Sequence, residues 1–233
     1  MERKRLTLKE LQAIPYKTEK KMIFNEEIEI IESEEQKDAD MFIPPHAKVL
    51  ELGGRYGLVA SAINHKLDDP TQHLVVEPDP TVQESLRYNR ESHFCQYSIF
   101  HGVISRRPLY FYQAGFASYC ATTPSDDPVE SVSLEDVQIR FSLPTFTHLV
   151  ADCEGGLEEF FEENKEFIKS LEGVYFEQDS RWFKPINYTP IKNQLQEWGF
   201  VQKKNGFRQY WVKEKLALQT QEQNETNATD SSG

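Results

Sequence analysis

Short apolar runs and amphipathic segments alternate along most of the chain. Runs of mainly apolar residues predict buried strands at 48–52, 73–77, 147–151 and 173–177. Segments with apolar residues three and four positions apart predict helices at 57–67, 80–91, 157–170 and 190–198. Strands that alternate with helices predict parallel βαβ units. We therefore expect an α/β fold of the Rossmann-like type, with a mostly parallel sheet flanked by helices.

The segments around this alternation predict the domain limits. Residues 98–104 and 109–112 indicate a further strand and a hairpin arm, and 199–202 with 207–212 indicate a closing antiparallel hairpin around Asn205-Gly206. Residues 1–45 are polar and uneven, with a candidate hairpin at 21–33, and we interpret them as an N-terminal extension. The main domain is expected at 46–215. Residues 216–233 contain almost nothing that can be buried, which predicts a disordered polar tail.

Charge and cysteine content restrict the partners and the compartment. Asp and Glu outnumber Lys and Arg by 38 to 26, giving a net charge of −12. Because such a surface repels phosphate groups, we expect no nucleic acid partner. Cys95, Cys120 and Cys153 form no C-x-x-C pair, which is typical of free thiols in a reducing compartment. No apolar run approaches the length of a membrane span and no signal-peptide pattern is present, so we expect a soluble, cytoplasmic protein.

A glycine-rich turn follows the first predicted strand. Residues 51–57 read E-L-G-G-R-Y-G, and the next strand ends in Glu77, 20 residues after Gly57. In an open α/β sheet these positions lie at the carboxyl ends of neighbouring strands. Glycines there let a ligand approach the backbone, and the second acid can accept hydrogen bonds from a ribose diol. The pair predicts a nucleoside-binding site.

Several ligands compete for this turn. A phosphate-binding NTPase loop requires G-K-[ST], which is absent here. A nicotinamide cofactor prefers G-x-G-x-x-G, which the turn only approximates, so a nicotinamide-dependent oxidoreductase stays an alternative. S-adenosylmethionine has no pyrophosphate, and the Glu51 carboxylate with loop carbonyls suits its sulfonium and amino-acid ends. A tight strand–helix turn without ligand and a catalytically silent cofactor-binding module are the remaining alternatives.

Four sequence blocks, in order, resemble the FkbM-type S-adenosylmethionine-dependent methyltransferases over about residues 46–180. The family loop D-V-G-A-N-x-G is similar to 51–57, and its F-E-P-x-P strand end is similar to V-E-P-D-P at 76–80. Its L-x-x-N helix end is similar to L-R-Y-N at 86–89, and its L-K-I-D-V-E-G-x-E block to L-V-A-D-C-E-G-G-L at 149–157. The chain departs from the family at Arg55 for Asn, Val150 for Lys and Leu157 for Glu. The resemblance implies a class I methyltransferase with a seven-stranded sheet.

Carboxylates after the later strands are candidates for preparing a methyl acceptor. An alcohol acceptor has a high pKa and needs a general base or a metal ion. Asp152 or Glu154 is the candidate base; alternatively, Asp152, Glu154 and Glu177 bind Mg²⁺ or Mn²⁺ as oxygen ligands. Either acid could instead cap the following helix. His148, inside its strand, is expected to be a core histidine.

The expected function is an S-adenosylmethionine-dependent O-methyltransferase acting on a sugar or glycan hydroxyl. Aromatic residues in the segments 115–123 and 180–188, which we interpret as loops, suit the CH faces of a sugar. The predicted cofactor-binding residues are Glu51, Gly53, Gly54, Arg55, Tyr56, Gly57, Glu77, Pro78, Asp79, Val103 and Asp152. Backbone around 102–104 is expected to form the adenine wall.

Overall fold

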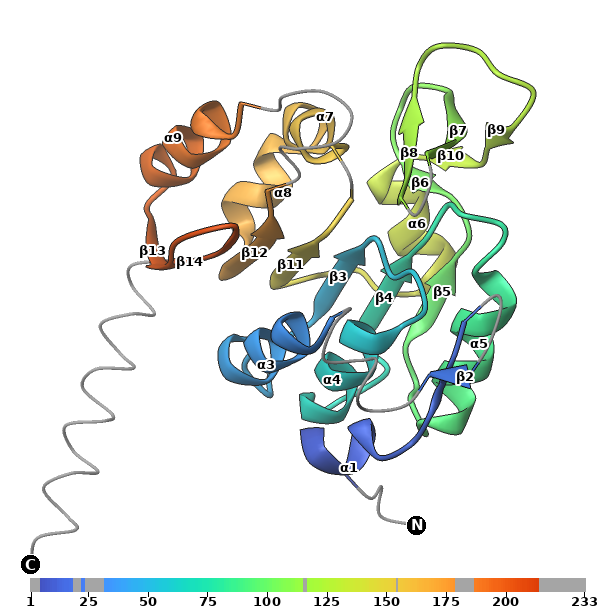
Figure 1. Ribbon diagram of the computed structural model, residues 1–233. Helices are drawn as coiled ribbons and strands as arrows, with labels where there is room; N and C mark the ends of the chain where they lie inside the picture. The colour runs from blue at the N-terminus through green and yellow to red at the C-terminus, as the bar shows by residue number, and fades with distance from the viewer. Residues whose placement is uncertain are drawn as a thin grey trace, which may run out of the picture.

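A seven-stranded sheet organises the chain (Figure 1). The computed structural model describes residues 5–18, 22–23, 32–114, 117–153, 155–178 and 187–213. The strands are, in sheet order, β13 (Phe200–Lys204), β14 (Arg208–Lys213), β12 (Gly173–Glu177), β11 (His148–Ala151), β3 (Val49–Leu52), β4 (His73–Val76) and β5 (Ser98–Phe100). The five from β12 to β5 are parallel, whereas β14 is antiparallel to both β12 and β13. The predicted mostly parallel sheet with a C-terminal antiparallel hairpin is confirmed.

Helices cover both faces of this sheet (Figure 1). Leu50 and Leu52 of β3 belong to a core shared with α6 (Leu134–Phe141), α7 (Leu157–Glu163), α8 (Lys165–Ser170) and α9 (Thr189–Glu197). Val49, which points to the other face, packs with α3 (Ser33–Phe42) and α4 (Leu58–Lys66). Helix α5 (Gln83–Ser92) lies on that same face, with Leu86 against Val75 of β4. Apolar residues on both faces of a strand explain its continuous apolar run.

The described residues also form three small sheets beside the main one. β7 (Leu109–Ala114) pairs antiparallel with β8 (Ala117–Ala121) and β9 (Pro128–Val129). β6 (Val103–Ile104) pairs parallel with β10 (Ser131–Val132). β1 (Tyr16–Lys17) pairs antiparallel with β2 (Met22–Ile23). The strand predicted at 98–104 is therefore divided into β5 and β6, and much of the segment predicted as a loop at 115–123 is the strand β8.

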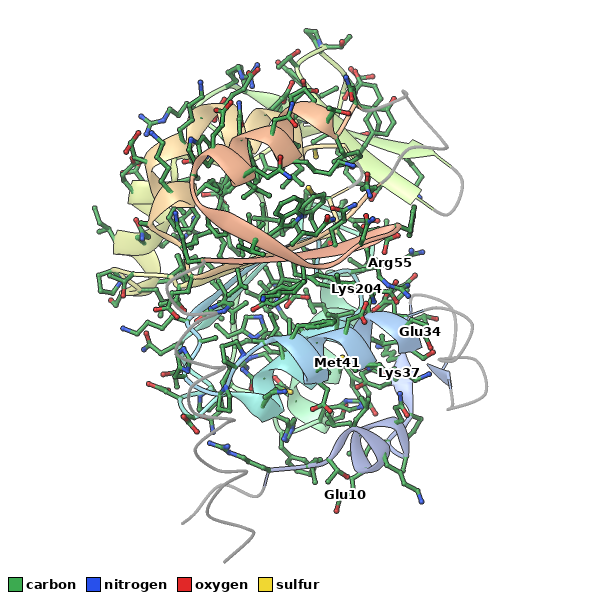
Figure 2. The ribbon with its side chains drawn as sticks, turned by 90° about the vertical axis from the view of Figure 1, so that its left-hand side faces the viewer. Glu10, Glu34, Lys37, Met41, Arg55 and Lys204 are labelled. Carbon is green, nitrogen blue, oxygen red and sulfur yellow. The ribbon has the colours of Figure 1, made fainter. Side chains whose placement is uncertain are left out.

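The N-terminal region differs from the prediction. Strand β2 pairs with the upstream strand β1, and Ser33 begins α3, whereas most of the hairpin predicted within 21–33 lies outside the described residues. Helix α1 (Leu8–Gln12) and α3 were not predicted, since few of their residues are apolar. Asp38 of α3 is buried and accepts hydrogen bonds from Tyr175, Lys204 and Arg208. Figure 2 shows Lys204 beside α3 and places Glu34, Lys37 and Met41 on that helix. Ionic contacts therefore help to hold α3 on the C-terminal hairpin.

Two predicted helices have different limits. The helix predicted at 80–91 begins at Gln83, because Asp79 accepts hydrogen bonds from the N–H and the hydroxyl of Thr81 and holds 79–81 in a turn. The helix predicted at 157–170 is interrupted at Asn164, where φ is −126°. The predicted tail at 216–233 lies outside the described residues. Among the described helices, none is both long and apolar enough to cross a lipid bilayer.

Candidate nucleoside-binding and acceptor site

A cavity of about 660 Å³ opens at the carboxyl ends of β3, β4 and β11. Its floor is formed by the residues that follow these three strands, and its walls by β6, the β7–β8 hairpin and helix α7. Ligands of open α/β sheets bind at this edge, and the volume is in the range of small-molecule sites. Of the residues predicted from the sequence, Gly53, Glu77 and Asp152 therefore face one cavity.

The glycine turn brings the three strand ends together. Gly53 has a φ of +87°, and its N–H donates to the Val76 carbonyl at 2.9 Å. A Cβ on Gly53 would lie 1.7 Å from the carbonyl oxygen of Asp152, so a larger residue cannot fit. Arg55 also has a left-handed φ, +41°, which is unusual for a residue with a Cβ. Glycine at 53 is thus required by the approach of β11 to β3.

Glu77 is held by backbone donors at the cavity. Its side chain is 5% exposed, with one carboxylate oxygen accepting the Arg55 N–H at 2.7 Å and the other the Asp79 N–H at 2.7 Å. Burial raises the pKa of Glu77 to about 7, against the lowering effect of these two backbone donors and of the Arg55 charge. Each oxygen keeps a second lone-pair direction. The carboxylate can therefore accept two further hydrogen bonds without losing the loop contacts.

The cavity contains most of the predicted cofactor residues but not all of them. Those that line it are Gly53, Arg55, Tyr56, Glu77, Pro78, Asp79, Val103 and Asp152. Gly54 packs toward Val75 and Gly57 toward Tyr97, behind the turn. Glu51 is buried on the same face of the sheet as Val49, with its carboxylate 2.8 Å from Nε2 of His73. The structure thus places Glu51 under the glycine turn as a scaffold residue, away from the cavity.

The predicted acceptor carboxylates have separate positions. Asp152 is exposed, follows β11 and lines the cavity, whereas Glu154 lies outside the described residues. Glu177 ends β12 opposite Arg208 in register and is not among the residues that line the cavity. Within the described part of the chain, no group of three or more His, Cys, Asp or Glu residues is placed to hold a metal ion. Of the predicted catalytic residues, the structure therefore places Asp152 on the cavity that Glu77 also lines.

His148 is a core residue, as its strand position indicates. Its ring is 2% exposed, and Nδ1 lies 3.0 Å from the Thr147 hydroxyl. Burial lowers the pKa of His148 to about 3, so the ring is neutral. It takes no part in the cavity.

The β7–β8 hairpin and helix α7 contribute further wall residues, of which Tyr119 was predicted among the aromatic residues of 115–123 and the others were missed. Gln113, Ser118, Tyr119 and Cys120 come from the hairpin, and Glu159, Phe160 and Glu163 from α7. Burial, together with the charges of Glu77 and Asp79, raises the pKa of Cys120 to about 12. The hairpin therefore approaches the part of the cavity that Glu77 and Asp79 line. The aromatic-rich composition of 110–119 was a signal, but its place over the sheet edge depends on long-range packing.

Acidic side chains dominate the described cavity wall. They are Glu77, Asp79, Asp152, Glu159 and Glu163, and Arg55 is the single basic residue among the described lining residues. Arg107 neutralises part of this charge, since its Nε donates to Glu163 at 2.8 Å and its terminal nitrogen lies 3.6 Å from Glu159. A cavity with this charge favours neutral or cationic groups over phosphates.

Comparisons with known proteins give distant structural likenesses. No protein-family model matches the sequence, and no curated protein sequence matches it. The chain is similar to an O-methyltransferase from Bacillus cereus in complex with SAH, at 12% identity, TM-score 0.46, over 77% of this chain and 81% of that one. It is also similar to precorrin-6y C5,15-methyltransferase from Geobacter metallireducens GS-15, at 12% identity, TM-score 0.46, over 84% and 92%. A third is ribosomal protein L11 methylase from Lactobacillus delbrueckii subsp. bulgaricus, at 13% identity, TM-score 0.41, over 77% and 76%.

Proposed function

We propose that this protein is an S-adenosylmethionine-dependent O-methyltransferase that acts on a hydroxyl of a sugar or glycan. The observation that carries the proposal is the Glu77 carboxylate, which is buried at the cavity and hydrogen-bonded to the Arg55 N–H of the glycine turn. A buried carboxylate that already satisfies two loop amides and can accept two more donors fits a ribose diol. The four sequence blocks that resemble FkbM-type methyltransferases support the same cofactor.

The cavity residues fit the parts of this cofactor. Glu77 would hold the ribose, and the apolar side chains of Val76, Val103 and Ile104 offer a surface for the adenine ring. The backbone around Gly53 and the Asp152 carboxylate would face the amino-acid end. When bound, S-adenosylmethionine would supply a methyl group on a sulfonium. An oxygen nucleophile would attack the methyl carbon in line, so that the O–C bond forms as the C–S bond breaks and S-adenosylhomocysteine leaves.

The acceptor side fits a neutral polyhydroxyl compound. Asp152 can take the proton of the attacking hydroxyl, because its carboxylate lies on the same cavity as Glu77. Glu159 and Glu163 are acceptors for further hydroxyl groups, and the rings of Tyr119 and Phe160 offer faces for sugar CH groups. Phosphate-bearing acceptors such as nucleic acids are disfavoured by the same carboxylates. Metal assistance by Asp152, Glu154 and Glu177 stays a prediction.

Calorimetry tests the cofactor first. We expect wild-type protein to bind S-adenosylhomocysteine, with Glu77→Ala binding at least tenfold more weakly; no binding by wild type would refute the proposal. Radiolabelled methyl transfer onto monosaccharides and glycans then tests the acceptor, with EDTA and with Mn²⁺ added back to test the metal.

A separate variant tests the base. Asp152→Asn should lower kcat by about 10²- to 10⁴-fold, since a general base contributes that much. Its affinity for S-adenosylhomocysteine should fall by a smaller factor than kcat, because the backbone around Gly53 still faces the amino-acid end of the ligand. Asp126→Asn, at an exposed position, is the matched control and should keep full activity. Unchanged kcat in Asp152→Asn would remove Asp152 as the base.

A further inference from the structure

The N-terminal arm, residues 5–18, contacts the glycine turn on the side that faces away from the cavity. It contains α1 and β1, and Figure 1 shows it passing below α4 toward α5. We propose that this arm holds the glycine turn in its cofactor-binding conformation, with Asn89 as the positioning residue between them. The inference rests on the proposed function, because it assigns a role in the same cofactor site.

Asn89 joins the arm to the turn through its side-chain amide. Its Oδ1 accepts the Lys17 N–H at 2.7 Å, and its Nδ2 donates to the Lys17 carbonyl and to the Tyr56 carbonyl, each at 2.8 Å. The residue is fully buried, so water does not compete for these bonds. One amide thus uses both of its donor hydrogens to connect β1 with a residue of the cavity wall.

Tyr16 fills the space directly behind the turn. It is fully buried in one apolar cluster with Tyr56, Leu58 and Val82, and two of these, Tyr56 and Val82, line the cavity. Its ring also stacks on His93 with centroids 3.8 Å apart. The turn therefore packs on the arm from behind, while its front faces the cavity.

Further bonds hold the arm in place. The Leu6 N–H donates to Nδ1 of His65 at 3.0 Å, which leaves His65 Nε2 to donate to the His93 carbonyl at 2.7 Å. Gln12 donates to Gln36 at 3.0 Å, and Gln36 donates to the Leu58 carbonyl at 2.9 Å. Leu58 begins α4, immediately after the turn. The arm is thus anchored along its length to the helix that the turn opens.

A turn supported from behind is already ordered before the cofactor binds. Arg55 shows why support is needed, since its left-handed φ of +41° is disfavoured for a residue with a Cβ. Loosening the arm should allow the turn to leave this conformation, and the cofactor then binds only the fraction of molecules that keep it. Because coupling is reciprocal, cofactor binding should also order the arm.

The decisive variant is Asn89→Asp, which keeps the shape of the side chain and removes both N–H donors. Asn64→Asp is the matched control, since Asn64 is equally buried and is hydrogen-bonded to Pro70, His73 and Gln96, which are not residues of the turn. We expect Asn89→Asp to bind S-adenosylhomocysteine about tenfold or more weakly, and the control to bind within about twofold of wild type. Equal losses in both variants would overturn the proposal. Tyr16→Leu is the second variant and should weaken binding in the same direction.

Hydrogen exchange separates this inference from the proposed function. In ligand-free protein the Gly57 amide, which donates to the Gly54 carbonyl, should exchange at least several times faster in Asn89→Asp and Tyr16→Leu than in Asn64→Asp. This result needs no cofactor, so it stands even where wild type binds none. In wild-type protein, binding of S-adenosylhomocysteine should slow the exchange of the Lys17 amide more than that of the Trp198 amide, which follows the distant helix α9. Unchanged Gly57 exchange, or equal protection of Lys17 and Trp198, would refute the role of the arm.

Discussion

Protonation of Glu77 should control cofactor affinity near neutral pH. The pKa of Glu77 is raised from 4.5 to about 7 by burial, so ligand-free protein holds this carboxyl partly protonated at pH 6 to 7. Two ribose hydroxyls donate best to the ionised form, because a protonated carboxyl loses one acceptor. Binding should therefore release a proton, and affinity should rise by up to about tenfold per pH unit until the pH passes 7.

The raised pKa of Glu77 also determines how the free energy of unfolding changes with pH. Between pH 4.5 and 7 the folded state binds more protons than the unfolded state, so the free energy of unfolding falls as pH rises through this window. The difference between the unfolded-state pKa of 4.5 and the folded-state pKa of about 7 corresponds to about 3 kcal/mol of stability. This stabilisation is fully lost above pH 7. Burial also raises the pKa of Glu32 to about 7, which adds a contribution of the same sign.

Glu77→Gln tests both effects in one variant. The glutamine amide leaves one of the two loop N–H groups unpaired, at a cost of about 1–3 kcal/mol. Removal of the buried charge regains about 3 kcal/mol above pH 7, so the variant should stay folded at pH 8. Loss of the ionised acceptor should cost about 2–3 kcal/mol of binding, a 30- to 150-fold weaker affinity for S-adenosylhomocysteine.

The assay is isothermal calorimetry from pH 5.5 to 8, in buffers of different ionisation enthalpy so that proton release is counted. Wild type should gain affinity with pH, whereas Glu77→Gln should be weak and nearly independent of pH. Glu130→Gln, at an exposed position paired with Arg140, is the matched control and should behave as wild type. A flat wild-type profile together with full affinity in Glu77→Gln would refute this reasoning.

Three further predictions follow from packing and charge. Gly53→Ala should lower the free energy of unfolding by about 3 kcal/mol or more in urea denaturation, because its Cβ would overlap a strand carbonyl. Gly199→Ala, with a φ of +80° but open space around it, should cost only about 1 kcal/mol, and equal losses would contradict the packing argument. Asp38→Asn should cost about 2 kcal/mol in the same assay, since the partly buried Lys204 loses its carboxylate while Arg208 keeps Glu35; a loss below about 0.5 kcal/mol would show that the network contributes little. Cys120 should react with iodoacetamide at pH 8 about a thousand times more slowly in folded than in unfolded protein, because its pKa is raised to about 12; similar rates by mass spectrometry would place the thiol in solvent.

Local patterns were sufficient for the central part of the fold. The parallel strands and the closing hairpin follow from apolar runs and turn residues, which act over a few positions. The turn at 53–57 and Glu77 could be paired because the carboxyl ends of adjacent parallel strands meet at one edge. Polar elements were harder to predict. Helix α3 has few apolar residues, and its buried face is satisfied by Tyr175, Lys204 and Arg208, which lie far away in the sequence.

The sequence by itself determined which candidate site residues follow each strand: a glycine turn after the first, an acid after the next and another acid after a later one. Only the tertiary structure decided which of these side chains share a cavity. Residues alternate between the two faces of a strand, and a glycine in a tight turn can serve packing as well as a ligand. Glu51 therefore lies behind the turn with His73, while Glu77 and Asp152 face the same space. The arm behind the turn and the hairpin in front of it were likewise placed by long-range contacts, which no local pattern encodes.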